Sequence, residues 1–231
     1  MIKMINPWKN FEISNEMVHE MDREAFENHN LRAKKPEHKL LKQLAPEPWI
    51  GSPGAKVLIL YANPGATEGD REGKRQKCAD RINELSAANL RGEIKDLPHF
   101  FFNEELKESD GYEWYAKRFR RLVEESSVKE VAQGIMTCEL APYHSVNWRK
   151  PSNDFATQKY TFEIVRQAVE DGKVILIMRG KETWLENVPG LANYLKSGRA
   201  FLPSSRQCAY ITSKNLGAGF DAALKAIRSE G

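Results

Sequence analysis

The sequence predicts an α/β protein: a three-layer α/β/α sandwich with a central four-stranded, mostly parallel sheet. Four short apolar runs divide the chain after residue 55, and each ends close to a glycine or a proline. Their apolar residues are consecutive, which is typical of strands that are covered on both faces in a parallel sheet. Segments with helical spacing lie between the runs, as this layered arrangement requires.

The elements follow from these patterns in chain order. In the N-terminal part, Met17, Met21 and Phe26 have helical spacing after Ser14, whose side chain favours a helix N-cap. The apolar runs predict strands over residues 57–61, 134–140, 173–178 and 200–202. Three further helices are expected to carry Tyr112, Tyr115, Phe119 and Leu122; Phe162, Val165 and Val169 before Gly172 as a C-cap; and Phe220, Leu224 and Ile227.

A change in composition divides the chain into two parts. The polar first part predicts a helical N-terminal arm, residues 1–50, that packs on the core of a single domain, residues 51–231. A proline-rich connector joins them, and Trp49 and Ile50 are expected to pin it to the domain. A domain of this length can bury a core without a disulfide or a metal.

Composition narrows the function classes. The 231 residues include 35 Lys and Arg against 32 Asp and Glu, for a net charge of +3, with 41% hydrophobic residues. These values exclude a membrane span, a coiled coil and a low-complexity tail, and they permit binding to DNA without requiring it. Cys78, Cys138 and Cys208 are far apart, which argues against a disulfide framework and a metal site. Because no signal-peptide pattern begins the chain, we expect a cytoplasmic protein without a metal or a cofactor.

The candidate site residues follow the predicted strands, because ligands of parallel sheets bind beyond the carboxyl ends of the strands. Asn63 and Gly65 follow the first strand. Glu139 stands inside the otherwise apolar second strand, near its end, where a carboxylate is costly without a partner. His144 comes soon after it and could act as an acid or a base near neutral pH. The fourth strand is followed by Ser204, Ser205 and Arg206.

Each candidate also has a purely structural interpretation. Asn-Pro-Gly is a common turn sequence. Glu139 could form a salt bridge with a neighbouring helix, for example with Arg166, and His144 could be a hydrogen-bonded, half-buried residue. Arg206 could be a solvated side chain in a turn. The placement of all of them at the ends of predicted parallel strands is what favours a common site.

The order of these segments resembles the uracil-DNA glycosylase superfamily over residues 56–213, and most of all its mismatch-specific uracil/thymine branch. Asn63-Pro64-Gly65 is similar to the first motif of that branch. Residues 134–140 look like the strand that carries the base-reading residue, and residues 174–181 look like an apolar strand that ends in Gly-Lys. Residues 201–206 look like the last strand and its Pro-Ser loop.

The resemblance implies a monofunctional DNA glycosylase that hydrolyses the N-glycosidic bond of a flipped base and leaves an abasic site. It implies that Asn63 orients the attacking water, where other members have aspartate. Gly65 replaces a tyrosine that excludes C5 substituents in the strict uracil enzymes. Glu139 takes the base-reading position, and an ionised carboxylate suits the N4 amino group of cytosine and opposes O4 of uracil. Ala62 and Phe102 complete the expected substrate-binding residues, although an aromatic triplet like residues 100–102 is more often part of a core.

Two positions depart from the family pattern. Leu202 stands where the family has histidine or asparagine before the Pro-Ser pair, so His144 is expected to take the catalytic role of polarising the leaving base. Arg206 stands at the tip that fills the gap left by a flipped base. The expected DNA-binding residues are Arg206, Ser204, Ser205, Arg71, Lys74, Arg75 and Arg149.

These residues together predict a glycosylase for C5-modified cytosine, such as the hydroxymethylated or glucosylated cytosine of phage DNA, with a role in phage defence. The expected partner is double-stranded or single-stranded DNA that contains the modified base. No membrane and no obligatory protein partner are expected, and the protein is expected to be a monomer. Three alternatives stay open: a mismatch uracil/thymine repair glycosylase, a hydrolase of free modified nucleotides, and a non-catalytic DNA-binding module.

Overall fold

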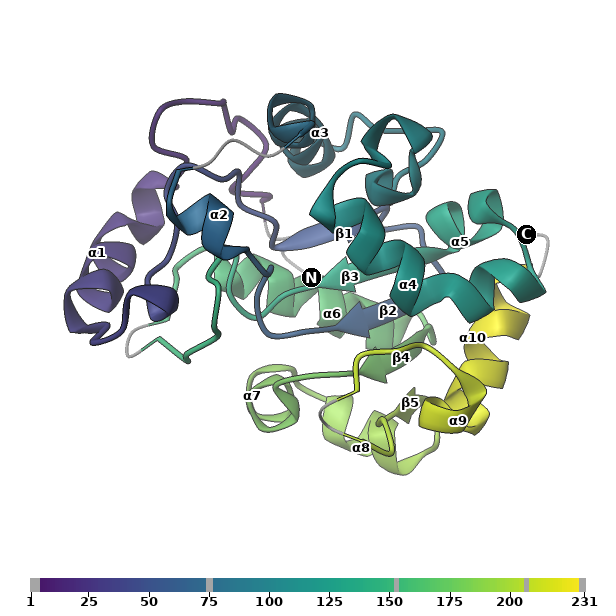
Figure 1. The fold of residues 1–231 in the computed structure, drawn as a ribbon. Helices are drawn as coiled ribbons and strands as arrows, with labels where there is room; N and C mark the ends of the chain where they lie inside the picture. Colours follow the sequence, from purple (N-terminus) through teal and green to yellow (C-terminus); the bar gives the residue numbers. More distant parts are fainter. Residues whose placement is uncertain (1–4, 74–76, 152–153, 206–207, 229–231) are drawn as a thin grey trace.

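The structure, a computed structural model, describes residues 5–73, 77–151, 154–205 and 208–228, and these form a mixed five-stranded sheet between helices (Figure 1). The strand order is β1-β3-β2-β4-β5, with parallel pairing of β2 with β3, β2 with β4, and β4 with β5. The strands are β1 (Trp49–Gly51), β2 (Val57–Leu60), β3 (Ile135–Cys138), β4 (Val174–Ile177) and β5 (Ala200–Phe201). The predicted α/β class is therefore confirmed.

The expected number of strands is wrong by one. Trp49 and Ile50, expected only to pin the connector, belong to β1, which pairs antiparallel with β3. The hydrophobic pattern did not predict this strand, because the strand is three residues long and follows a proline-rich segment. The expected boundary between residues 50 and 51 falls inside it.

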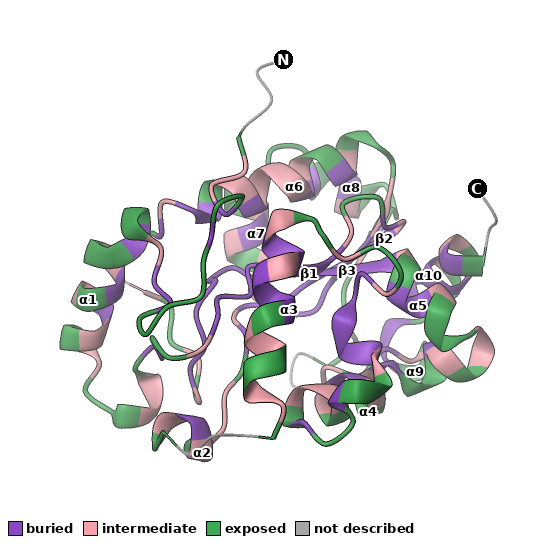
Figure 2. Cartoon of the chain, turned by 90° about the horizontal axis from the view of Figure 1, so that it is seen from above, coloured by how far each residue is buried: buried purple, intermediate pink, exposed green. Residues whose placement is uncertain are grey.

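Helices cover both faces of the sheet. Figure 2 shows the buried strands between α6 and α8 on one side and α4 and α9 on the other. The helices in the described part of the chain are α1 (Arg23–Arg32), α2 (Glu68–Arg71), α3 (Ala79–Arg91), α4 (Asp110–Glu125), α5 (Val128–Gly134), α6 (Gln158–Glu170), α7 (Lys181–Asn187), α8 (Leu191–Lys196), α9 (Ser213–Leu216) and α10 (Ala218–Arg228). Short 3-10 turns lie at Glu20–Asp22, Pro36–His38, Phe100–Phe102 and Glu104–Leu106. None of the helices in these described ranges is long and apolar enough to cross a membrane.

Alternation along the strands divides the core into two layers. Leu58 and Leu60 of β2 pack toward the side of α6 and α8, whereas Val57 and Ile59 pack toward α4, α5 and α10. All four are at most 1% exposed, and each such aliphatic side chain contributes about 1.5–3 kcal/mol by its burial. Burial on both faces explains why the sequence shows a continuous apolar run here.

The expected helices around the sheet are confirmed. Ser109 caps α4 by accepting a hydrogen bond from the Tyr112 amide (3.1 Å), and α4 buries Tyr115, Phe119 and Leu122. Gly172 follows α6 with φ +74°, a left-handed conformation that suits a C-cap glycine. The last helix, α10, buries Phe220, Leu224 and Ile227 as expected.

The N-terminal arm differs from the expected helix. The Met17 amide donates to the Lys42 carbonyl (2.7 Å), and helix α1 begins only at Arg23. The Met21 side chain is 59% exposed, so the expected apolar face is not formed. The arm is nevertheless held firmly, because the buried Asp22 carboxylate accepts hydrogen bonds from Tyr143 Oη (2.8 Å) and Thr157 N (3.0 Å).

Candidate functional site

A pocket of about 510 Å³ lies beyond the carboxyl ends of β2, β3 and β4. This is the place where sheets with parallel strands bind their ligands. The N-terminal arm, α3 and α4 contribute the remaining walls. Among the predicted site residues, the pocket brings together Ala62, Asn63, Gly65, Glu139 and His144.

The orientation of the Asn63 side chain is set by its amide nitrogen. Asn63 Nδ2 donates to the Pro64 carbonyl (2.8 Å) and to Ser145 Oγ (3.0 Å). Ser145 is 2% exposed and pairs with Gly65 through a parallel bridge, so the loops after β2 and β3 hold each other. With both amide hydrogens used, Oδ1 is the atom of Asn63 that can accept a hydrogen bond from a water molecule or a ligand.

Gly65 leaves free space in the part of the pocket that it lines. A Cβ atom built at Gly65 would meet no atom within 4 Å, and its φ is outside the left-handed region. The glycine is therefore not required by the local backbone or by packing. Its effect on the pocket is the room that a side chain would otherwise take.

Glu139 places a buried carboxyl group in the pocket. The residue is 7% exposed, and within the described part of the chain Glu139 Oε2 has no hydrogen-bond partner. Burial raises the pKa of the Glu139 carboxyl well above its usual range, and the nearby Glu47 charge raises it further. Burial therefore favours the neutral acid, which offers one donor as well as acceptors. Arg166, considered above as a partner for Glu139, pairs with Glu163 (2.6 Å) and Glu170 of its own helix.

Glu47 is a second buried carboxyl group in the pocket, and the sequence did not indicate it. Its Oε1 accepts a hydrogen bond from Ser86 Oγ (3.0 Å), and its Oε2 lies 3.9 Å from His144 Nε2. Burial raises the pKa of Glu47, while His144 and the Ser86 hydroxyl act in the opposite direction. Glu47 reaches the pocket because β1 pairs with β3: the Glu139 amide donates to the Pro48 carbonyl (2.9 Å).

His144 holds the loops together. Its Nδ1 lies 2.7 Å from the Gly65 carbonyl oxygen, and its Nε2 lies 3.0 Å from the Ala45 carbonyl oxygen. These contacts use both ring nitrogens, so in this arrangement the ring has no N–H left for a base in the pocket. The geometry supports a positioning role, in place of the expected direct action on the leaving base.

Aromatic side chains and two arginines also line the pocket and form what we call its aromatic wall. The Trp114 ring packs edge-on against Tyr61 with 5.6 Å between ring centroids, and the Arg118 guanidinium lies 4.0 Å from the Trp114 centroid. Arg179, which follows β4, also lines this wall. Among the described residues, Tyr61 Oη and Arg118 Nε are buried without a hydrogen-bond partner. A planar polar ligand could stack on such a wall and satisfy polar groups beside it.

Phe102 does not line this pocket, contrary to expectation. It is 5% exposed and packs in the aromatic core, with its ring centroid 5.0 Å from that of His99 and 5.8 Å from that of Phe119. Its neighbour Phe101 lines the pocket. The 3-10 turn at Phe100–Phe102 points successive side chains in different directions, which residue spacing alone did not resolve.

The expected DNA-binding residues are only partly placed around the pocket. Arg71 pairs with Glu68 (2.5 Å), which follows the pocket loop, and with Glu72 (3.7 Å). Ser204 and Ser205 are exposed and bound to Asn215: the Ser204 amide donates to the Asn215 carbonyl (2.7 Å) and the Ser205 amide to Asn215 Oδ1 (3.3 Å). Lys74, Arg75 and Arg206 lie outside the described residues.

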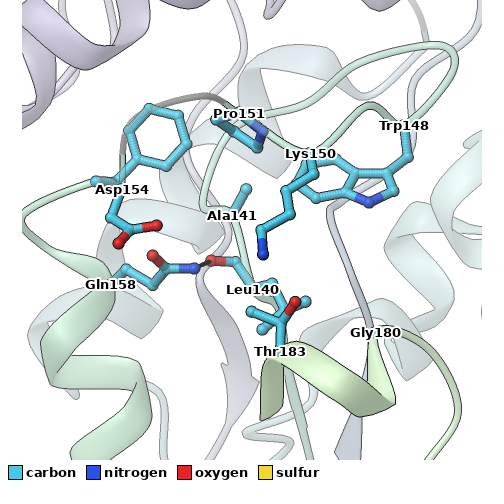
Figure 3. Close-up of a pocket in the computed structure, with 10 residues that line it drawn as sticks. Leu140, Ala141, Trp148, Lys150, Pro151, Asp154, Gln158, Gly180 and Thr183 are labelled. Atoms are coloured by element: carbon cyan, nitrogen blue, oxygen red, sulfur yellow. Dashed lines mark hydrogen bonds between the residues drawn. The ribbon is translucent and has the colours of Figure 1, made fainter. Parts of the chain in front are cut away.

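Arg149 and Lys150 lie on an exposed loop that also touches the pocket, through Trp148. Trp148 additionally lines a smaller pocket of about 60 Å³ (Figure 3). In Figure 3 the Lys150 side chain points into this smaller pocket, toward Gln158 and Thr183, and the Gln158 amide donates to the Leu140 carbonyl. The smaller pocket has room for a few water molecules at most.

Comparison with known proteins does not assign the chain to a family. No protein-family model, curated protein or solved structure matches this chain. The function must therefore be argued from the site itself.

The strand-end rule could have found Arg179, since it stands directly after the third apolar run in the sequence. Trp114 and Arg118 are four residues apart on one helix, and this spacing could have indicated their contact. Glu47 carries no comparable signal, because only the pairing of β1 with β3 brings it to the pocket.

Proposed function

We propose that this protein is a DNA glycosylase that hydrolyses the N-glycosidic bond of a flipped cytosine with a C5 substituent and leaves an abasic site. One observation carries the proposal: Asn63, Gly65 and Glu139 come from the ends of two neighbouring parallel strands and line one pocket. These are the positions that the uracil-DNA glycosylase resemblance assigns to the attacking water, to C5 of the base and to the base edge. The proposal includes a uracil-DNA glycosylase-like fold for the core.

The pocket has the chemistry that a flipped base needs. An extruded base is read by hydrogen bonds to its edge and by stacking between aromatic or apolar side chains. The wall formed by Tyr61, Phe101 and Trp114 supplies stacking surfaces, and Glu139 supplies edge contacts. Asn63 Oδ1 would orient the water that attacks C1′ of the sugar, and precise positioning of this kind accelerates such a step substantially.

The space that Gly65 leaves beside C5 of the base is the feature that favours a modified base. The neutral Glu139 carboxyl can donate to N3 of cytosine and accept from its N4 amino group, but it can equally donate to O4 of uracil and accept from its N3–H. The protonated form of Glu139 therefore does not discriminate between cytosine and uracil, as an ionised carboxylate was expected to do. Gly65 remains as the feature that distinguishes substrates, because it admits a substituent at C5. For the same reason, mismatch uracil/thymine excision is the second candidate.

Activity on modified phage DNA would place the protein in the cytoplasm and in phage defence. Electrostatic attraction would come from Arg118 and Arg179 at the pocket and from the exposed Arg149 and Lys150 beside it. The substrate is a DNA strand, and the geometry of one pocket in one chain requires no second protein.

Incubation of the protein with a panel of duplexes tests the proposal. Each duplex carries a single test base, which is cytosine, 5-hydroxymethylcytosine, glucosylated 5-hydroxymethylcytosine, uracil or mismatched thymine. Abasic sites are measured by alkaline cleavage. We expect release of the C5-substituted cytosines, and a loss of at least about 100-fold for Asn63→Ala. Release of uracil or thymine alone would favour mismatch repair, and the same modified bases presented as free nucleotides test the nucleotide hydrolase. Absence of base release from every substrate would overturn the proposal.

A further inference from the structure

Release of cytosine requires a group that stabilises the leaving base, and the residues assigned so far do not supply one. When the C1′–N1 bond breaks, its electron pair stays on the base, and an unprotonated cytosine anion is a poor leaving group. The family pattern would supply stabilisation from the position that Leu202 occupies, and Leu202 is exposed and does not line the pocket. His144 has both ring nitrogens at backbone carbonyl oxygens. Another group in the pocket must therefore act on the base.

Among the described pocket residues, Glu139 is the acid best matched to this task. Arg118 and Arg179 do not give up a proton in proteins. Burial raises the pKa of the Tyr61 hydroxyl far above its usual value, which makes it a poor proton donor. Glu139 combines a favoured neutral form with an oxygen that has no hydrogen-bond partner among the described residues, and it lies at the position expected to meet the base edge.

Glu47 is placed to keep that proton on Glu139. The two residues belong to neighbouring antiparallel segments, Glu47 just before β1 and Glu139 just after β3. Two buried carboxyl groups that interact electrostatically do not both ionise readily, so a negative charge on Glu47 favours the protonated form of Glu139. Among the described residues, the other titratable or charged groups that line the pocket or lie close to Glu139 are Tyr61, Asp70, Asp110, Tyr115, Arg118, Cys138, His144 and Arg179.

We propose that Glu139 is the catalytic acid that protonates N3 of the departing cytosine, and that Glu47 is a positioning residue that maintains the protonated form of Glu139. This inference rests on the proposed glycosylase activity. In the step, the Glu139 O–H proton moves to N3 as the C1′–N1 bond breaks, and the base leaves as neutral cytosine. The oxygen of water bonds to C1′ and releases its proton to solvent. Glu139 takes up a proton from solvent after the base has left.

The test compares two bases that differ in their need for a proton. One duplex carries 5-hydroxymethylcytosine, and the other carries 5-bromouracil, which has a C5 substituent and leaves readily as an anion. We expect Glu139→Gln to lower kcat on the cytosine substrate by about 100- to 1000-fold. On 5-bromouracil we expect a loss of less than about 10-fold, because glutamine keeps a donor and an acceptor at the same place. Glu139→Asp, which retains an acid, should recover part of the cytosine activity.

Controls separate the possible outcomes. Glu186→Gln changes an exposed carboxylate on α7 and should leave both rates unchanged. Glu47→Gln should shift the alkaline fall of cytosine release to lower pH, because a nearby negative charge is removed. Equal losses on both bases in Glu139→Gln, or no loss on cytosine, would overturn the inference while leaving the glycosylase activity standing. If the wild-type protein releases neither base, the proposed function fails and the inference fails with it.

Discussion

At the residue scale, Asn63 and Gly65 shape the side of the pocket that follows β2. Asn63 is held through both amide hydrogens, and Ser145, which receives one of them, is almost fully buried. Gly65 has no steric or conformational need to be glycine. A position that borders the pocket and has room for a Cβ atom is a position where substrate selection can act at little cost in stability.

Gly65→Tyr is therefore expected to change specificity and to leave folding intact. The tyrosine ring would occupy the space beside C5, so release of 5-hydroxymethylcytosine should fall by about 10- to 100-fold, since overpacking costs about 1–3 kcal/mol. The free energy of unfolding should change by less than about 1 kcal/mol, because the backbone there accepts a side chain. Base release assays and urea unfolding measure the two effects.

Gly54→Tyr is the matched control, because Gly54 is also exposed, has no left-handed φ and lies away from the pocket. It should leave both the rate and the stability close to those of the wild type. Retention of full activity on C5-substituted cytosine by Gly65→Tyr would show that C5 does not face this residue.

At the element scale, the segment before α9 is organised by one buried side chain. Asn215, 6% exposed, accepts from the Ser205 amide (3.3 Å) and donates from Nδ2 to the Cys208 (3.3 Å) and Tyr210 (2.9 Å) carbonyl oxygens. It thus bridges residues on both sides of positions 206–207. Ala209, between the two carbonyl groups that Asn215 binds, lines the pocket, so Asn215 helps to set the shape of the site.

Asn215→Ala is expected to lower the free energy of unfolding by about 1–3 kcal/mol, because the Ser205 amide and the Cys208 and Tyr210 carbonyl groups lose their hydrogen-bond partner. The expected fall in Tm is about 2–4 °C for each kcal/mol in a chain of this size. The Ser205 amide should exchange its hydrogen faster. Asn187→Ala is the control: it removes one exposed side-chain hydrogen bond to the Thr183 carbonyl (2.9 Å) on α7, and it should have little effect. Unchanged exchange at Ser205 would contradict the bridging role.

At the scale of the whole molecule, one buried histidine makes the stability of the fold depend on pH. His99 is 0% exposed, its ring centroid lies 4.5 Å from that of Tyr115, and its Nδ1 has no partner among the described residues. Burial lowers the pKa of His99 from 6.5 to about 3. Below pH 6.5 the unfolded chain takes up a proton that the folded chain does not, so this group makes stability fall as the pH falls toward about 3. The buried Glu47 and Glu139, whose pKa values are raised, act in the opposite sense: they reduce stability as the pH rises above the ordinary pKa of glutamate.

His99→Phe isolates the contribution of the histidine, since phenylalanine suits the aromatic surroundings and does not titrate. Relative to the wild type, the variant should gain about 1.4 kcal/mol of unfolding free energy for each pH unit between pH 6 and pH 4. Urea unfolding at a series of pH values measures this difference, from which the effects of Glu47 and Glu139 cancel. Between pH 7.5 and pH 8.5 the two curves should run parallel, and parallel curves down to pH 4 would contradict the prediction.

The sequence alone predicted the parts of the fold that local patterns encode. Consecutive apolar residues in β2, β3 and β4 indicated strands buried on both faces, because such strands need no alternation. The rule that ligands bind at strand ends then indicated Asn63, Gly65 and Glu139, and all three line the pocket. Strand β1 was missed, because three residues after a proline-rich segment carry too little pattern.

The tertiary structure decided what each of these groups can do. Pairing of β1 with β3 brings Glu47 beside Glu139, and burial of both carboxyl groups favours a neutral acid where the sequence suggested a charged one. Backbone carbonyl groups from two distant segments use both nitrogens of His144, and a 3-10 turn puts Phe101 in the pocket in place of Phe102. Residue types and strand ends are local properties, but protonation and hydrogen-bond partners depend on segments that are far apart in the chain, so only the folded molecule determines them.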